Sequence, residues 1–81
     1  MKEVSFACGE VGPSGAVGFP ADNPEAVVLM LGNETSDLRR VRTASGEKYI
    51  SKDKGLSIWL KGTDMTLELP GGATHICALR S

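Results

Sequence analysis

The sequence predicts an all-β domain, and three observations favour this class over a helical one. No window of about a dozen residues keeps apolar side chains at the spacing of an amphipathic helix. Ten glycines and four prolines interrupt the chain, and both residue types are unfavourable inside helices. Eight short segments suited to strands are separated by turn residues. Together these features are typical of a small closed antiparallel barrel or a sandwich.

The expected strands are short and follow one another closely. They cover residues 4–8, 15–19, 26–31, 37–42, 47–51, 56–61, 64–69 and 74–79. The stretch "GPSG", residues 12–15, predicts a turn in which Gly15 takes a positive φ. The stretch "KGTD", residues 61–64, predicts a tight hairpin turn.

Alternation predicts which side chains of the strand at 56–61 face the core. Leu56, Ile58 and Leu60 share one face, which we expect to be buried. The opposite face carries Ser57, Trp59 and Lys61. The same pattern in 64–69 turns Met65, Leu67 and Leu69 inward and Thr66 and Glu68 outward. Trp59 is expected to be a wall residue or a partly exposed platform, and its indole can brace the stem of Lys61.

A chain of 81 residues, 41% hydrophobic and 23% charged, is expected to form a single domain over 1–81. Its core is thin, so a covalent link would be useful. A bridge between Cys8 and Cys77 would close a loop of roughly 70 residues, worth about 4 kcal/mol in the chain-entropy model. A metal pair and two free thiols are the alternatives. One histidine and two distant cysteines fall short of a four-ligand zinc set, so we favour a disulfide and an oxidising compartment.

Composition argues against several kinds of partner. The net charge is −1, and the chain holds only four aromatic residues and no basic cluster longer than Arg39–Arg40. We therefore expect no nucleic-acid partner. No phosphate-binding or dinucleotide motif is present, so no small-molecule cofactor and no metal are expected. No charged start with an apolar stretch is found, so any lipid anchor of a natural precursor is expected upstream of this chain.

Catalysis is not expected. Ser45 lacks the preceding glycine of a nucleophile elbow, because Thr43 occupies that position. The single histidine, His75, lies in an apolar segment next to Cys77, where a structural role is favoured. Paired carboxylates exist, but a thin barrel offers little cleft in which to bind a sugar. On the residues alone, Ser45–Gly46 is a plain turn and Lys61 a solvated side chain beside another turn.

Three stretches together give the chain a family resemblance. They are "TASGEKY" (43–49), "LSIWLKGTDMTLEL" (56–69) and "THICAL" (74–79). The chain resembles the bacterial membrane-bound and periplasmic inhibitors of c-type lysozyme. That family is marked by S-G-x-x-Y, matched by Ser45, Gly46 and Tyr49, and by T/S-K-G, matched at Lys61 and Gly62. Its early and late cysteines are matched by Cys8 and Cys77.

The resemblance implies an eight-stranded antiparallel β-barrel whose loops enter the active-site cleft of a c-type lysozyme, in the bacterial periplasm or anchored to the envelope membrane. Ser45 and Lys61 are expected to approach the two catalytic carboxylates of the enzyme. Gly46 would let the backbone enter the cleft, and Gly62 belongs to the matched motif. Tyr49 and Trp59 are expected to brace the site or to contact the partner at its rim.

Two departures from the family pattern keep alternatives open. Leu60 stands where the family usually has Thr or Ser, and Leu56 where an aromatic residue is common. The segment "ISKDKG", residues 50–55, is about two residues longer than usual and is expected to alter the rim of the site. The alternative functions are a barrel that binds another protein or a polysaccharide of the cell envelope, and a purely structural envelope lipoprotein.

Overall fold

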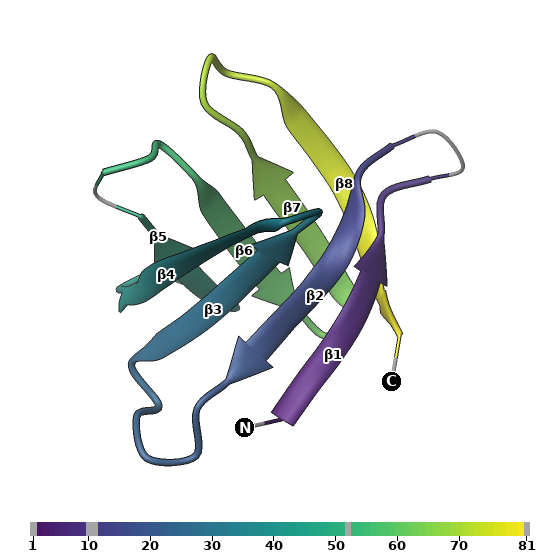
Figure 1. Ribbon diagram of the computed structural model, residues 1–81. Coiled ribbons are helices and arrows are strands. Elements are labelled where there is room, and N and C mark those ends of the chain that lie inside the picture. Colours follow the sequence, from purple (N-terminus) through teal and green to yellow (C-terminus); the bar gives the residue numbers. More distant parts are fainter. Residues whose placement is uncertain (1, 10–11, 52, 81) are drawn as a thin grey trace.

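The computed structural model describes residues 2–9, 12–51 and 53–80, which form antiparallel strands (Figure 1). The strands are β1 (Lys2–Ala7), β2 (Ser14–Phe19), β3 (Ala26–Leu31), β4 (Glu34–Val41), β5 (Glu47–Ile50), β6 (Ser57–Lys61), β7 (Asp64–Glu68) and β8 (Thr74–Arg80). Each strand pairs with the next along the chain, and β8 pairs with β1 to close the sheet. The predicted all-β class and eight-stranded barrel are confirmed, and the sandwich is wrong.

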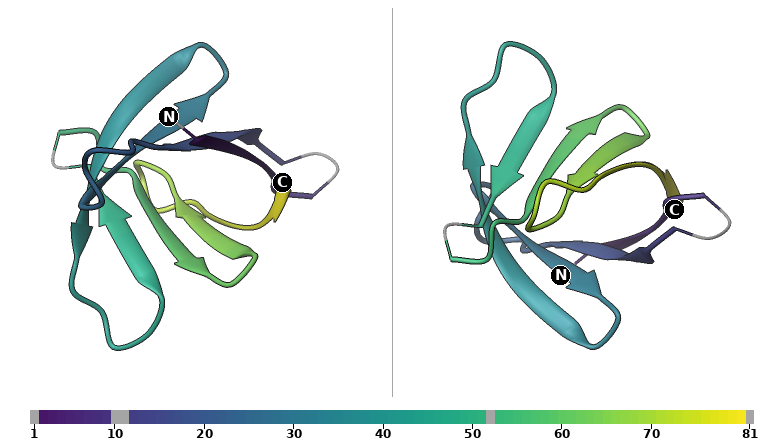
Figure 2. Two further views of the ribbon diagram at one scale, coloured as in Figure 1. Left: turned by 90° about the horizontal axis from the view of Figure 1, so that it is seen from below. Right: turned by 90° about the horizontal axis from the view of Figure 1, so that it is seen from above.

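The barrel closes where the first and last strands meet. Seen from below and from above, the strands surround a common interior (Figure 2). The pairing of β1 with β8 is short, running from Ser5↔Arg80 to Ala7↔Ala78. Cys8, the residue that follows β1, forms a disulfide with Cys77 in β8. The predicted bridge is therefore confirmed, and it covalently links the two strands whose ends are furthest apart in the sequence.

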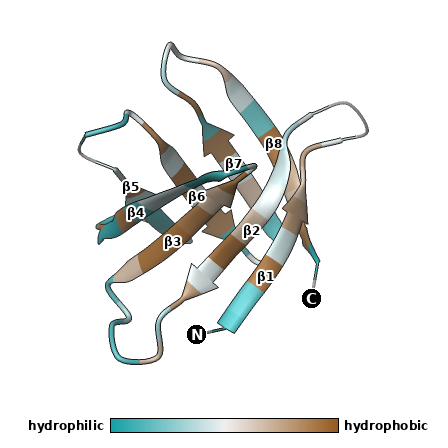
Figure 3. Cartoon of the chain, viewed as in Figure 1, coloured by the Kyte–Doolittle hydropathy of each residue, from teal (hydrophilic) through white to brown (hydrophobic). Residues whose placement is uncertain are grey.

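Hydrophobic residues recur along the strands (Figure 3), and in β4 and β7 alternate side chains are buried in the interior. The completely buried side chains include Val17, Leu38, Ile58, Met65 and Leu67. Leu56 and Leu60 are also buried, while Trp59 and Lys61 are exposed, so the predicted faces of β6 are confirmed for these residues.

One residue departs from this expected pattern of faces. Ser57 was expected on the outward face but is only 8% exposed. Its small side chain lies between two larger cross-strand neighbours, Ile50 and Glu68. Leu69, which was expected to face inward, lies just beyond the end of β7 and packs against the core, as expected.

The turns follow the glycines, with one exception. The "KGTD" hairpin is confirmed: Gly62 has a φ of 63° at the first position of a two-residue connection, as in a type II′ turn. The expectation for Gly15 is wrong, because Gly15 lies inside β2 and does not take a positive φ. A side chain there is excluded by the neighbouring strand, since a Cβ atom would lie 2.0 Å from the carbonyl oxygen of Met30.

The barrel has two ends, which we name by their residues. The Ser45 end carries the connections 20–25, 42–46 and 62–63, together with the start of β1 and the end of β8. The Cys8 end carries the turn 32–33, the connection 69–73 and the connections that follow β1 and β5. Lys2 pairs with Phe19, so β1 begins at the Ser45 end.

Candidate functional site

The structure brings Ser45 and Lys61 to the same end of the barrel. The β5–β6 ladder ends with Glu47 opposite Leu60. The next residues beyond this pair are Gly46, which precedes β5, and Lys61, which ends β6. A shallow hollow of about 530 Å³ lies between them. Its lining residues are Phe19, Gly46, Glu47, Leu60, Lys61, Gly62 and Leu79. Three of the five predicted binding residues therefore line one surface, and Ser45 directly precedes it in the chain.

The main chain of Ser45 is fixed from two sides. Its N–H donates to Thr43 Oγ1 at 3.1 Å, and the Thr43 hydroxyl donates back to the Ser45 carbonyl. The indole N–H of Trp59 donates to that same carbonyl at 3.0 Å. The Ser45 side chain is exposed, and among the described residues its hydroxyl has no hydrogen-bond partner. The main chain is thus held by the protein, while the hydroxyl is available to another molecule.

Two separate features of the structure require glycine at position 46. The φ of Gly46 is 70°, which is unfavourable for residues with a side chain. A Cβ atom would also lie 2.7 Å from the carbonyl oxygen of Leu60 and 2.8 Å from Nε1 of Trp59. The sequence had suggested only that a missing side chain helps entry into a cleft. The structure adds a reason within the protein: the backbone at Gly46 packs directly on β6.

Trp59 makes a contact with the Ser45 loop that the sequence did not indicate. Its side chain is 40% exposed, which agrees with a partly exposed platform. Its indole N–H donates to the Ser45 carbonyl, and the bracing of the Lys61 stem by the indole stays a prediction. Trp59 and Lys61 also line a second hollow of about 380 Å³, with Asp64, Thr66 and Ile76. Trp59 therefore connects the loop 42–46 to the wall of the barrel.

Tyr49, in β5, is buried in the core rather than exposed at the surface of the site. Only 3% of the residue is exposed, and its hydroxyl donates to Glu47 Oε2 at 3.0 Å. Burial, followed by this hydrogen bond to Glu47, raises the pKa of the Tyr49 phenol above its ordinary value. Of the two roles expected for Tyr49, bracing suits its position, because a buried side chain presents almost no surface to a partner.

The two departures from the family pattern lie at opposite ends. Leu60 faces inward, is 8% exposed and lines the hollow beside Lys61. An apolar side chain therefore closes the core at the position where the family usually has a hydroxyl. In the longer segment "ISKDKG", Ile50 ends β5 and Lys52 lies outside the described residues, while the other residues lie between β5 and β6 at the Cys8 end. The expectation that this segment shapes the rim is wrong, because the strand order places it at the far end of the barrel from Ser45.

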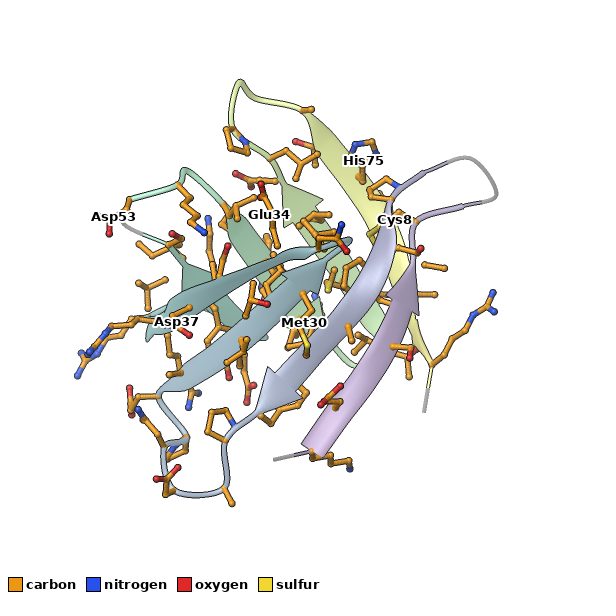
Figure 4. The ribbon with its side chains drawn as sticks, viewed as in Figure 1. Cys8, Met30, Glu34, Asp37, Asp53 and His75 are labelled. Carbon is orange, nitrogen blue, oxygen red and sulfur yellow. A yellow bond between two sulfur atoms is a disulfide. The ribbon has the colours of Figure 1, made fainter. Side chains whose placement is uncertain are left out.

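His75 is far from Ser45 along the barrel. It pairs with Leu67 near the start of β8, at the Cys8 end, where Figure 4 also labels Cys8. Within residues 2–9, 12–51 and 53–80, no three His, Cys, Asp or Glu side chains are grouped to hold a metal ion. Over the same residues, no helix has the length and apolar character needed to cross a membrane.

Comparison with known families identifies the chain. The model of the family described as membrane-bound lysozyme-inhibitor of c-type lysozyme matches residues 6–75. The chain belongs to this family. The match includes Ser45, Gly46, Tyr49, Lys61 and Gly62. No curated protein and no solved structure matches the chain. Membership implies that c-type lysozyme is the partner and inhibition the activity.

This lysozyme-inhibitor family member carries a feature at the site that the sequence motifs did not indicate. A polar hollow of about 410 Å³ lies on another side of the loop, lined by Glu25, Arg40, Val41, Arg42, Thr43 and Gly46. Gly46 lines both this hollow and the one beside Lys61. The pair Arg39–Arg40 was visible in the sequence, but only Arg40 lines this hollow, together with Arg42. The position of Arg40 depends on the pairing of β4 with β5, in which it lies opposite Tyr49.

Proposed function

We propose that this protein inhibits c-type lysozyme by inserting the Ser45–Gly46 tip and the Lys61 side chain into the active-site cleft, next to the catalytic carboxylates. The observation that carries the proposal is the juxtaposition at one barrel end. The β5–β6 register sets Gly46 beside Lys61, and the exposed Ser45 precedes Gly46. The loop residues 44–46 are exposed, so they can be reached by a partner.

The chemistry of the two side chains suits a cleft with two carboxyl groups. A retaining glycosidase of this type keeps one carboxyl protonated and the other ionised. A serine hydroxyl can accept a hydrogen bond from the first and donate one to the second. The Lys61 ammonium can form a charge-assisted hydrogen bond with the ionised carboxylate. Each such bond is worth about 1.5–3 kcal/mol, so packing of the surrounding surface must supply the rest of the affinity.

The remaining site residues support this contact in different ways. Gly46 allows close approach of the backbone, and Gly62 keeps the end of β6 in a tight turn. Tyr49 and Leu60 act from the interior. The protein acts as a binding partner rather than as an enzyme, and it needs no cofactor. We place it in the bacterial periplasm, in soluble form or held at the membrane by a lipid anchor on a precursor.

Lysis of bacterial cell walls by a hen-type c-type lysozyme tests the proposal. The wild-type protein should slow lysis, and Ser45→Ala and Lys61→Ala should weaken this without lowering the melting temperature. Ser14→Ala is a matched control, since Ser14 is an exposed serine at the Cys8 end. Undiminished lysis at a large molar excess of wild-type protein would overturn the proposal and favour a barrel that binds another envelope component.

A further inference from the structure

The loop that carries Ser45 is mostly exposed. Residues 42 and 44–46 are exposed, and Thr43 is half-buried. The hydrogen bonds between Thr43 and Ser45 hold the turn together but stay within the loop. Among the described residues, the indole of Trp59 makes the side-chain hydrogen bond that ties Ser45 to the barrel wall. Without this bond, the tip would have its internal turn but no side-chain link to β6.

Packing at Gly46 holds the loop against β6 in addition to the hydrogen bond from the indole. Nε1 of Trp59 and the carbonyl oxygen of Leu60 both lie within 3 Å of where a Cβ atom of Gly46 would be. The indole therefore lies against the tip at two consecutive residues, bonding to the carbonyl of Ser45 and packing on the backbone of Gly46. This arrangement holds the backbone that carries the Ser45 side chain before any partner arrives.

We propose that Trp59 is a positioning residue for inhibition: its indole N–H holds the tip so that Ser45 enters the lysozyme cleft already in its binding conformation. This inference rests on the function proposed above. A loop ordered in advance pays less conformational entropy on association. Trp59 therefore strengthens inhibition by positioning Ser45. Its indole N–H already donates to the Ser45 carbonyl within the protein.

A double-mutant cycle separates this role from direct contact with the enzyme. Trp59→Phe keeps an aromatic side chain and removes the N–H donor. We expect it to weaken inhibition roughly 3- to 10-fold, the range of a neutral hydrogen bond. In a Ser45→Ala background the same change should cost less than about twofold, because the group that it positions is absent. In a Lys61→Ala background the full factor should remain.

Two outcomes of the cycle would overturn the proposal. If Trp59→Phe costs the same factor with and without Ser45, Trp59 acts through its own contact with the enzyme. If it costs nothing in the otherwise wild-type protein, the indole bond does not contribute. A melting temperature measured for each variant shows that the comparison is made between folded proteins.

A readout without lysozyme keeps this inference distinct from the proposed function. In the free protein, Trp59→Phe should speed amide hydrogen exchange at Ser45 and Gly46 and leave exchange at Gly32, in the turn at the Cys8 end, unchanged. Unchanged exchange at the tip would overturn the positioning role whatever the lysis assay gives. If wild-type protein fails to inhibit but exchange at the tip rises, the proposed function fails while the indole is still shown to hold the loop.

Discussion

The two ends of the barrel are held together in different ways. At the Cys8 end, the disulfide Cys8–Cys77 links the first strand to the last. At the same end, Lys54 Nζ donates to Ser36 Oγ at 3.2 Å and to the Thr35 carbonyl at 3.4 Å. At the Ser45 end, Ser45 and Lys61 are exposed, and the described residues give the Ser45 hydroxyl no partner.

This difference indicates how a very small domain can combine stability with recognition. A chain of 81 residues has a thin core and needs extra constraint. The covalent constraint lies at the end that carries no candidate binding residue. The polar groups left for a partner are at the other end, where the indole bond of Trp59 ties Ser45 to the barrel. Changes at the two ends should therefore have separable effects on stability and on inhibition.

The largest expected effect is on stability, from the Cys8 end. Replacing both cysteines, Cys8→Ala with Cys77→Ala, should lower the free energy of unfolding by about 4 kcal/mol, because the bridge closes a long loop. Urea denaturation measures this change. At temperatures where the variant remains folded, its inhibition of lysozyme should stay within about twofold of wild type. A large loss of inhibition in the folded variant would contradict the separation of the two ends.

Two lysines at opposite ends of the barrel give a matched pair of variants. The expected loss of binding free energy for Lys61→Ala is about half the loss of stability expected without the disulfide. Lys61→Ala should weaken inhibition by about 2 kcal/mol, or roughly 30-fold, through loss of a charge-assisted bond, and should leave the melting temperature unchanged. Lys54→Ala should do the reverse, since Lys54 bonds to β4 within the protein. Inhibition constants and thermal melts measure both. If Lys54→Ala weakens inhibition as much as Lys61→Ala, the ends are not functionally distinct.

Two glycines sharpen the comparison further. Gly46 and Gly32 have similar φ values, 70° and 58°, so alanine meets similar backbone strain at each. Nothing lies within 4 Å of a Cβ atom at Gly32, whereas Leu60 and Trp59 crowd Gly46. Gly46→Ala should therefore destabilise the protein by at least about 1 kcal/mol more than Gly32→Ala. It should also weaken inhibition, while Gly32→Ala should not. Equal unfolding midpoints would show that contact with β6 does not restrict the tip.

The smallest expected effect is a loss of stability in strong base. The pKa of Tyr49 is raised in the folded protein by burial and by the bond to Glu47. The folded state therefore keeps this proton at pH values where the unfolded chain releases it. The resulting contribution is fully present below the ordinary phenol pKa of about 10 and is lost as the pH rises through the folded value.

Urea midpoints measured between neutral and strongly basic pH test this sign. The midpoint should fall above the ordinary phenol pKa in wild type, and the fall should be smaller in Tyr49→Phe, which has no phenol to ionise. A midpoint that rises in this pH range, or the same fall in both proteins, would contradict the assignment.

Much of the fold follows from local patterns. Alternation correctly placed Ile58, Met65 and Leu67 in the core, because a strand turns successive side chains to opposite faces. The hairpin at Gly62 followed from its turn chemistry. Gly15 was misjudged because its constraint comes from the carbonyl of Met30 on a neighbouring strand. A barrel and a sandwich share the same local signals, so only the family resemblance favoured closure.

The site was harder to predict than the fold. Motifs identified Ser45 and Lys61 as candidates, but not how they are held. The bond from Trp59 to the Ser45 carbonyl joins residues from the loop and from β6, and it depends on the strand register. The sequence analysis also placed the segment "ISKDKG" at the wrong end of the barrel. The number of residues between Tyr49 and Lys61 does not indicate which connections lie at the same end of the barrel. Arg40 and Arg42 were not connected with the site for the same reason.

The pairing of Lys2 with Phe19 has a practical consequence for handling the protein. Phe19 lines the hollow that also contains Gly46 and Lys61, so a tag or a surface linker joined at the N-terminus emerges beside the residues proposed to meet lysozyme. The exposed turn at Gly71 and Gly72 lies at the other end. A fluorophore or an immobilisation point placed in that turn would leave the Ser45 end open to solution in a binding measurement.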